Sequence, residues 1–238
     1  QAQGEESNVI INSRILIDNG ILTILAADSI EQHADIVSTG GTLDLQAQAG
    51  AVSMDDPVQS SSSSGDMRYQ AGTSITLSSL DVTGENSGNV AIIAGENILD
   101  AGDTHYEVRA AGLYLEAGAS IGLLGDTPDS LEISVDTLAA QSGSGGVNLL
   151  EASTVTVQDV SVSVGRVGDN GAVAEEKVQK EDLRSSAGGD IVLVAADSIT
   201  VAEGSLEDND GNTLGIKTLG SGNIFLNVSN GNIEVNSG

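Results

Sequence analysis

Few residues in this sequence have the type and spacing that catalysis or metal binding requires. The 238 residues include two histidines, His33 and His105, and no cysteine. The histidines are far apart and each lies among polar residues, so we expect both at the surface, without a catalytic or ligand role. The lack of cysteine excludes disulfides and thiolate metal sites. The sequence therefore predicts no catalytic, cofactor-binding or metal-binding residues and no enzyme.

One segment has the oxygen-rich composition of a calcium loop. Residues 208–212 read Asp-Asn-Asp-Gly-Asn, and carboxylate oxygens around a tight glycine turn suit a hard cation. The twelfth position counted from Asp208 is Leu219 rather than the glutamate of a calcium loop. An ordinary solvated turn is therefore favoured, and calcium at Asp208 and Asp210 remains the alternative.

A second alternative is a carbohydrate-binding or polysaccharide-cleaving protein. Such enzymes need carboxylates gathered on one face, usually with aromatic rings on which sugars stack. Asp44 and Glu116 are predicted to point outward on the same side of the fold, with Tyr114 between them, but about three repeats separate them. A groove lined by acidic residues and by Tyr106 or Tyr114 would favour this alternative.

Charge and hydropathy exclude two classes of partner. Thirty-five acidic and eight basic residues give a net charge of −27, which argues against nucleic acid and anionic membranes. The longest apolar run, residues 90–94, is far too short to span a bilayer. We interpret the charge as a means of keeping an elongated protein with a large surface soluble. Adaptation to high salt, or binding of divalent cations between carboxylates, is the alternative.

A degenerate repeat supplies the elements that any site would use. Residues 22–30 and 191–199 are almost identical, with apolar residues at offsets 0, 2, 4 and 8. Eight copies start at Leu22, Leu43, Ile75, Val90, Leu113, Val147, Ile191 and Ile224. Alternation with period 2 indicates short strands with one buried face, and Gly-Gly or Gly-Asn dipeptides before the strands indicate tight corners. Strands this short must stack on neighbouring copies, which predicts a β-solenoid of about eleven coils.

Two stretches lack the pattern and are predicted to be loop insertions. Residues 55–70 contain Pro57 and five consecutive serines, and residues 165–186 mix both charges without period. Within the second stretch, residues 173–183 could form a short helix, but a mobile loop is favoured. Glu151 occupies an offset that is otherwise small, and we expect a local shift that gives its place to Ala152.

The repeat also resembles a known family. Residues 188–201, Gly-Gly-Asp-Ile-Val-Leu-Val-Ala-Ala-Asp-Ser-Ile-Thr-Val, look like the repeats of filamentous-haemagglutinin-type exoproteins and related giant bacterial adhesins. The resemblance covers nearly the whole chain. It implies a right-handed parallel β-helix exported to the bacterial cell surface.

Outward positions of the repeat give one candidate interaction surface. At offset 3 four of the eight copies carry a large aliphatic residue, namely Leu25, Ile93, Leu150 and Val194. Apolar groups in register along a rod can mark a contact with another rod, or the insertions can simply cover them.

These observations together predict one continuous, all-β parallel β-helix over residues 1–238, with two loop insertions, that is a segment of a longer protein. The expected function is a structural stalk or filament segment of a bacterial adhesin or extracellular matrix protein. A self-assembling extracellular filament subunit is a further alternative. The expected partners are other copies of the chain or flanking solenoid coils, with surface glycans or proteins as further candidates.

Overall fold

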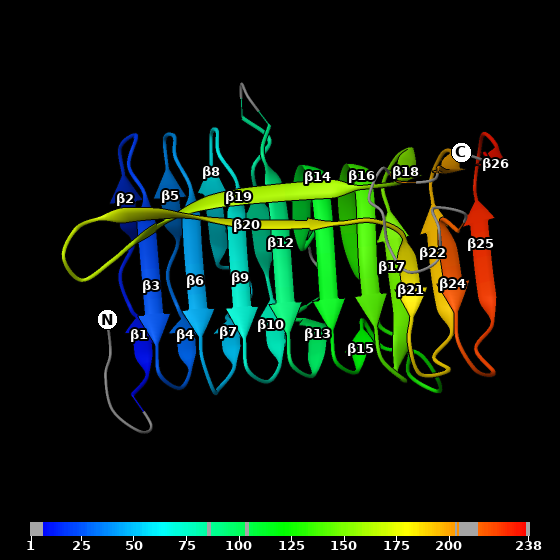
Figure 1. Ribbon diagram of the computed structural model, residues 1–238, viewed down its shortest axis with the longest axis horizontal. Coiled ribbons are helices and arrows are strands. Elements are labelled where there is room, and N and C mark those ends of the chain that lie inside the picture. The colour runs from blue at the N-terminus through cyan, green and yellow to red at the C-terminus, as the bar shows by residue number, and fades with distance from the viewer. Residues whose placement is uncertain (1–6, 85–86, 103–104, 203, 205–213, 237–238) are drawn as a thin grey trace.

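The computed structural model describes residues 7–84, 87–102, 105–202, 204 and 214–236. These residues form strands and turns without a helix, and nearly all strands pair in parallel with the strands one coil before and after them. Figure 1 shows the coils side by side along one axis, with the front strands running downward as the coils advance from left to right. The fold is thus a right-handed parallel β-helix, as predicted.

Each N-terminal coil contributes one strand to each of three sheets. The first sheet contains β3 (Leu22–Ala26), β6 (Leu43–Ala47), β9 (Met67–Ala71) and β12 (Asn89–Ala94). The second contains β1 (Val9–Ile11), β4 (Ile30–Gln32), β7 (Val52–Met54), β10 (Ile75–Leu77), β13 (Asn97–Asp100) and β15 (Ser120–Ile121). The third contains β2 (Ile15–Ile17), β5 (Ile36–Ser38), β8 (Gln59–Ser62) and β11 (Ser79–Asp81).

Two long strands then lead into the C-terminal coils. β14 (Val108–Ala117) and β16 (Leu131–Ser142) bend from the third sheet into the first. Beyond them, β17 (Gly146–Glu151), β22 (Ile191–Ala195) and β25 (Ile224–Val228) continue the second and third sheets as single strands. The first sheet divides after β16 into two groups of paired strands. One group contains β18 (Val155–Val157), β23 (Ile199–Val201) and β26 (Ile233–Val235). The other contains β21 (Leu183–Ser185) and β24 (Ile216–Thr218).

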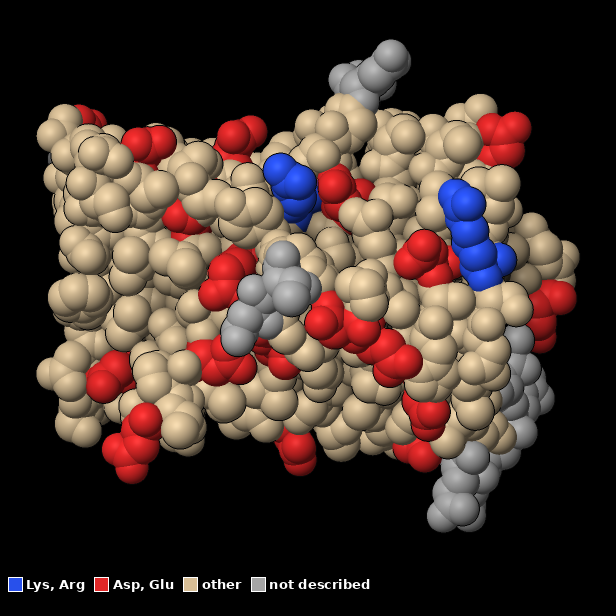
Figure 2. Space-filling view, turned by 180° about the vertical axis from the view of Figure 1, so that it is seen from behind, with Lys and Arg blue, Asp and Glu red and all other residues tan. Residues whose placement is uncertain are grey.

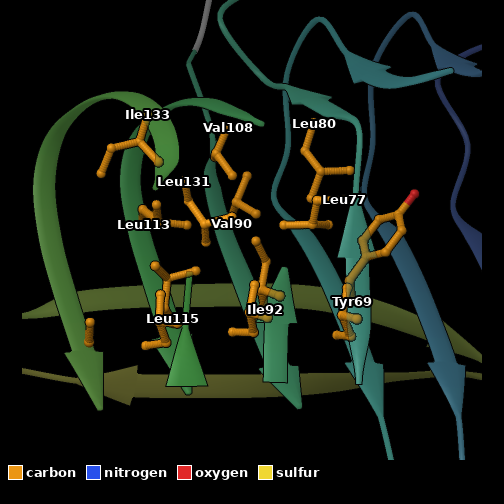
Figure 3. Close-up of a cluster of buried hydrophobic side chains, with 14 of the residues drawn as sticks. Tyr69, Leu77, Leu80, Val90, Ile92, Val108, Leu113, Leu115, Leu131 and Ile133 are labelled. Atoms are coloured by element: carbon orange, nitrogen blue, oxygen red, sulfur yellow. The ribbon is translucent and has the colours of Figure 1, made fainter. Parts of the chain in front are cut away.

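Stacked aliphatic side chains fill the interior (Figure 3). The second sheet carries an unbroken column of β-branched residues, one per coil: Val9, Ile30, Val52, Ile75, Ile98, Ile121, Val147, Ile191 and Ile224. All seven between the two ends are fully buried. Branched side chains fit the pleated surface, so each coil offers the next a matching row. The column has nine members, so the residues that the structure describes form nine coils, against the expected eleven or so.

The eight predicted repeat copies do not share one column. Leu22, Leu43, Val90 and Leu113 lie in the first sheet. Ile75, Val147, Ile191 and Ile224 lie in the second sheet instead. The near-identical segments 22–30 and 191–199 therefore occupy different sides of the solenoid, because the pattern specifies only a strand, a corner and a strand.

The prediction of a loop at residues 55–70 was wrong. The segment contains β8 (Gln59–Ser62) and most of β9 (Met67–Ala71), both paired with neighbouring coils. Ser60 and Ser62 are buried and Ser61 lies between them, so the serine run alternates as a strand does. A run of one residue type conceals this alternation from hydrophobic patterning.

Tyr69 explains why serine is used in β8. Its ring is fully buried in the core, and its hydroxyl oxygen lies within hydrogen-bond distance of Ser60 Oγ at 2.6 Å and of Gln32 Oε1 at 3.2 Å. Gln32 Nε2 in turn donates to Ser60 Oγ at 2.9 Å. Burial raises the pKa of the Tyr69 hydroxyl far above its usual value. The three side chains thus form a satisfied polar network within the apolar stack.

The second predicted loop, residues 165–186, is also corrected. β19 (Val160–Val167) and β20 (Val173–Lys180) form an antiparallel hairpin, and β21 returns the chain to the solenoid. Residues 173–180 are thus a strand rather than a helix or a mobile loop. The hairpin leaves the C-terminal coils and lies across the first-sheet strands of the earlier coils (Figure 1).

Glu151 does not yield its place to Ala152 as expected. It pairs with Ile133 on one side and Ala195 on the other, in a column of inward residues, and is fully buried. Its oxygens accept from the backbone nitrogens of Val135 at 3.0 Å and Ser153 at 2.9 Å, and from the Ser153 hydroxyl. Burial nevertheless raises the pKa of the Glu151 carboxyl to about 7, because these donors offset only part of the desolvation.

Candidate functional site

The hairpin covers an apolar strip on the outside of the first sheet. The side chains of Val160, Val162 and Val164 are buried, and they pack on Ala91, Tyr114 and Ala139 of three successive coils. Alternation of valine with polar residues along β19 gives the strand one apolar face. This strip forms a second, smaller core outside the main one.

The free edge of β19 is hydrogen-bonded to side chains of four coils. Asn89 Nδ2 donates to the Ser161 carbonyl at 2.8 Å, and Ser163 N donates to Asp66 Oδ2 at 2.7 Å. Gly165 N donates to Thr42 Oγ1 and Val167 N to Thr23 Oγ1, both at 2.9 Å. Two residues of β19 therefore correspond to one coil, and this edge of β19 is hydrogen-bonded to the solenoid without another strand.

A buried ionic network fixes the middle of the hairpin. Asp44 is fully buried and binds Arg68 of the next coil at 3.0 Å from Nε to Oδ1. It also binds Arg166 of the hairpin at 2.8 Å from Nε to Oδ2. Glu176 of β20 lies 3.5 Å from Arg68 and 3.9 Å from Arg166. Asp44 is thus the buried partner of both arginines, and if it were lost only the more distant Glu176, whose side chain is 38% exposed, would remain to pair with them.

The predicted interaction residues fall into separate places. Leu25 and Ile93 lie in the first sheet with Gln46 and Gln70 between them in register, and Ile93 packs against the hairpin core. Leu150 and Val194 are direct neighbours on adjacent coils of another side, and Leu150 is 40% exposed. The structure therefore brings together only the second pair, and the four residues form no common outward column.

The outward carboxylates considered for polysaccharide cleavage are not gathered either. Asp44 is buried in the arginine network, and its register partners lead to Tyr114 rather than to Glu116. Glu116 accepts a very short hydrogen bond from the hydroxyl of Tyr114. Tyr114 is buried beneath the hairpin and offers no platform for a sugar ring.

Tyr106, by contrast, lines a pocket on the outside of the third sheet. The pocket has a volume of about 250 Å³ and is lined by Pro57, Gln59, Ser79, Asp81, His105, Tyr106 and Arg109. The Arg109 guanidinium lies 5.3 Å from the centre of the Tyr106 ring, within cation–π distance. An aromatic face, a carboxylate and a guanidinium thus meet in one hollow. Hydrophobic patterning could not find it, because its residues come from three successive coils.

Each of the two histidines has a carboxylate neighbour, and these neighbours, Asp55 and Asp56, are adjacent in the sequence. His33 Nδ1 lies 2.7 Å from Asp55, and the hydrogen bond raises the pKa of its exposed imidazole. His105 Nε2 lies 3.0 Å from Ser78 Oγ and 3.4 Å from Asp56. Ser120 stands in a Gly-x-Ser-x-Gly spacing at residues 118–122. Ser120 is buried and donates to Asn97 Oδ1 at 2.8 Å, so its spacing marks a solenoid corner rather than a nucleophile elbow.

Three carboxylates that the sequence analysis did not single out converge at the corner between the second and third sheets. One oxygen each of Asp100, Glu107 and Glu132 lies within 4.8 Å of the others. Glu107 is fully buried, and burial, together with the neighbouring Asp100 and Glu132, raises its pKa to about 10. No hydrophobic or motif signal marks this cluster, because the three residues come from two coils.

The possible calcium residues Asp208 and Asp210 lie outside the described residues. Acidic side chains are spread over the face shown in Figure 2, and basic side chains are few there, in keeping with the net charge of −27. Among the described residues, no helix is long and apolar enough to cross a membrane. No family model, curated protein or solved structure matches this chain.

Proposed function

We propose that this chain is a non-catalytic structural segment, a stalk or filament segment of an extracellular bacterial surface protein. The observation that carries the proposal is the unbroken column of nine β-branched residues from Val9 to Ile224. Eight steps of about 4.8 Å give a rod about 40 Å long that separates whatever lies at its two ends. The resemblance of residues 188–201 to filamentous-haemagglutinin-type repeats supports the placement at a bacterial surface.

The two ends of the rod support a partner of the same kind. Within the described residues, β1, β2 and β3 pair only with the following coil, and β24, β25 and β26 only with the preceding one. Leu16 at one end is 64% exposed, and Phe225 at the other end is 54% exposed. Open strand edges with apolar side chains favour another solenoid coil as the partner, either a flanking coil or a second copy.

Sedimentation of the purified chain tests this proposal. We expect association that grows with protein concentration, and rods of multiple length in electron microscopy. The double variant Leu16→Asp with Phe225→Asp should stay monomeric with an unchanged circular dichroism spectrum. The matched control, Leu150→Asp with Val194→Asp, changes the lateral pair and should leave end-to-end association intact. A wild-type chain that stays monomeric, or association blocked only by the lateral variant, would contradict contact through the ends.

The proposed location is tested on intact cells of the source organism. Antibodies against the folded chain should label cells whose envelope has not been permeabilised, because a surface stalk is exposed. Labelling that appears only after permeabilisation would overturn the extracellular placement.

A second candidate function is carbohydrate binding, and the pocket at Tyr106 favours it. Tyr106 is partly exposed and Asp81 and Arg109 line the same hollow, which suits stacking and hydrogen bonding to a charged sugar. A glycan array combined with a turnover assay tests it. Binding that is lost in Tyr106→Ala, without turnover, would support a lectin-like role, and no binding by the wild type would leave the purely structural role.

A further inference from the structure

The acidic corner at Asp100, Glu107 and Glu132 has an arrangement that ordinary surface acids lack. Glu107 and Glu132 stand next to each other on adjacent coils, since Glu107 N donates to the Glu132 carbonyl at 2.9 Å. Like charges stacked directly across a parallel pair are destabilising unless something lies between them. Asp100 approaches from the second sheet, where it pairs in register with the fully buried Leu77.

Each of the three carboxylates is held by a local donor on one oxygen. Glu107 Oε2 accepts from Glu132 N at 2.5 Å, and Glu132 Oε1 accepts from Ser130 Oγ at 2.8 Å. Asp100 Oδ1 accepts from Gly102 N at 2.7 Å. These bonds fix the carboxylates in orientation before any ligand arrives, which lowers the entropy that binding would cost.

The remaining oxygens of the two glutamates supply a second, independent observation. Glu107 Oε1 and Glu132 Oε2 are both buried, and neither has a hydrogen-bond donor. A buried carboxylate oxygen without a donor keeps the cost of its lost hydration, and native proteins leave few of them. Two such oxygens on adjacent coils, in a cluster whose ligand atoms all lie within 4.8 Å, indicate that a positive group belongs between them.

We propose that Asp100, Glu107 and Glu132 form a divalent-cation site of calcium type that ties the second sheet to the third. The ligands are all carboxylate oxygens, which hard cations prefer over nitrogen or sulfur. Calcium–oxygen distances of about 2.3 to 2.6 Å place opposite ligands about 5 Å apart, which accommodates the spacing of the three oxygens. Water completes the coordination, because three residues supply fewer oxygens than the six to eight that calcium binds.

Calorimetric titration of the purified 238-residue chain with calcium chloride tests this site. After treatment with chelator and return to chelator-free buffer at constant ionic strength, the wild type should bind calcium saturably near one ion per chain. Glu107→Gln keeps the shape of the side chain and an acceptor for Glu132 N but cannot lose a proton to become a carboxylate ligand, so the affinity should fall at least tenfold. Asp136→Asn, at an exposed position of β16, is the matched control and should bind as the wild type does.

Thermal unfolding gives a readout that does not depend on the acidic surface as a whole. Calcium should raise the melting temperature of the wild type and Asp136→Asn by the same amount, and that of Glu107→Gln much less. Asp100→Asn, at a less buried position, should show the same loss if Glu107→Gln folds poorly. Equal calcium responses in all variants would show only diffuse binding to surface acids, and they would overturn the site. The same holds for a wild type that binds no calcium, in which a proton alone would occupy the space.

Discussion

The coils before residue 121 and the coils after residue 147 build the same interior from the same local pattern, but they set it at different sides of the solenoid. Residues 22–30 place a five-residue strand in the first sheet, and the strand that begins at Ile30 lies in the second. Residues 191–199 run through the second and third sheets and reach the first only at β23. The side is therefore set by stacking on the previous coil, not by the residues of the copy itself.

The corners of the middle and C-terminal coils differ in the residue that follows the strand. In the first two coils this residue is Ala27 and Gln48, in the middle coils it is glycine, at Gly72, Gly95, Gly118 and Gly143, and in the C-terminal coils it is Ala152, Ala196 and Ser229. A Cβ atom placed on Gly95 would lie 2.0 Å from the carbonyl oxygen of Gly72, the equivalent residue one coil earlier. The middle coils thus approach so closely at this corner that no side chain fits, whereas the shifted coils accept one.

The largest test of this difference is Gly95→Ala. We expect a loss of about 4 kcal/mol or more in the free energy of unfolding, because the clash is with backbone that cannot rotate away. Urea unfolding followed by circular dichroism measures it. Gly168→Ala in the hairpin turn is the control, with its nearest atom at 3.2 Å. Ala196→Gly should cost only about 1 kcal/mol through backbone entropy. Equal losses at positions 95 and 196 would show that the two corners do not differ.

The hairpin is the link between the two regions, and Asp44→Asn is the change that breaks it. The substitution leaves Arg68 and Arg166 with a neutral side chain at position 44 and only the more distant Glu176 as a charged partner, so we expect a loss of about 3 kcal/mol in the free energy of unfolding. Limited proteolysis should cut residues 160–180 faster than in the wild type, while the solenoid strands stay protected. Asp169→Asn in the hairpin turn is the matched control. If both variants are cut at the wild-type rate, the arginine network does not hold the hairpin.

Glu151 makes the C-terminal region sensitive to pH. Its pKa is about 7 when folded and near 4.5 in the unfolded chain, so the folded state binds the extra proton. The contribution of protonated Glu151 to the free energy of unfolding is complete below about pH 4.5. It falls by up to about 3 kcal/mol as the pH rises through 7. Urea unfolding at pH 5 and pH 8 should show that the free energy of unfolding falls more between these pH values in the wild type than in Glu151→Gln. Parallel falls in the two proteins would show that Glu151 does not titrate on unfolding.

The smallest expected effect is in the N-terminal region, at Tyr69→Phe. Loss of the hydroxyl leaves the ring in place but removes a hydrogen-bond partner of Ser60 and Gln32, which costs about 1 kcal/mol. Tyr106→Phe at the exposed pocket is the control and should change stability little. The urea midpoints of Tyr69→Phe and Tyr106→Phe are compared with that of the wild type. Equal shifts in the two variants would mean that the buried network contributes nothing beyond packing.

The strands that the sequence reveals are those whose buried faces carry aliphatic residues. Val90 and Ile92 or Ile191 and Leu193 alternate with less apolar or outward residues, and the β-helix follows from such copies. β8 was not predicted as a strand because serine stands at both its inward and its outward positions. The inward Ser60 is explained only by its hydrogen bond to Tyr69, nine residues later. The burial of Glu151 was not predicted because the backbone donors that bind its carboxylate belong partly to another coil.

The functional candidates were harder to predict, because each is assembled across coils. The carboxylates of Asp100 and Glu132 meet although 32 positions separate them, and the Tyr106 pocket joins residues from 57 to 109. The hairpin was mistaken for a loop because β20 is largely exposed and charged, so that it lacks an apolar face of its own. Its partner β19 shows the alternation at Val160, Val162 and Val164, and this was the signal available.

The hairpin also changes how the rod should come apart. In a simple stack each coil touches only its neighbours, so terminal coils can fray one at a time. β19 is bonded to four coils at once, from Thr23 to Asn89, and packs on Ala139 beyond them. Unzipping from the N-terminal end must therefore detach a segment that belongs to the far end. A chain of nearest-neighbour contacts is converted into one cooperative block, and a pulling force would meet that block as a single mechanical unit.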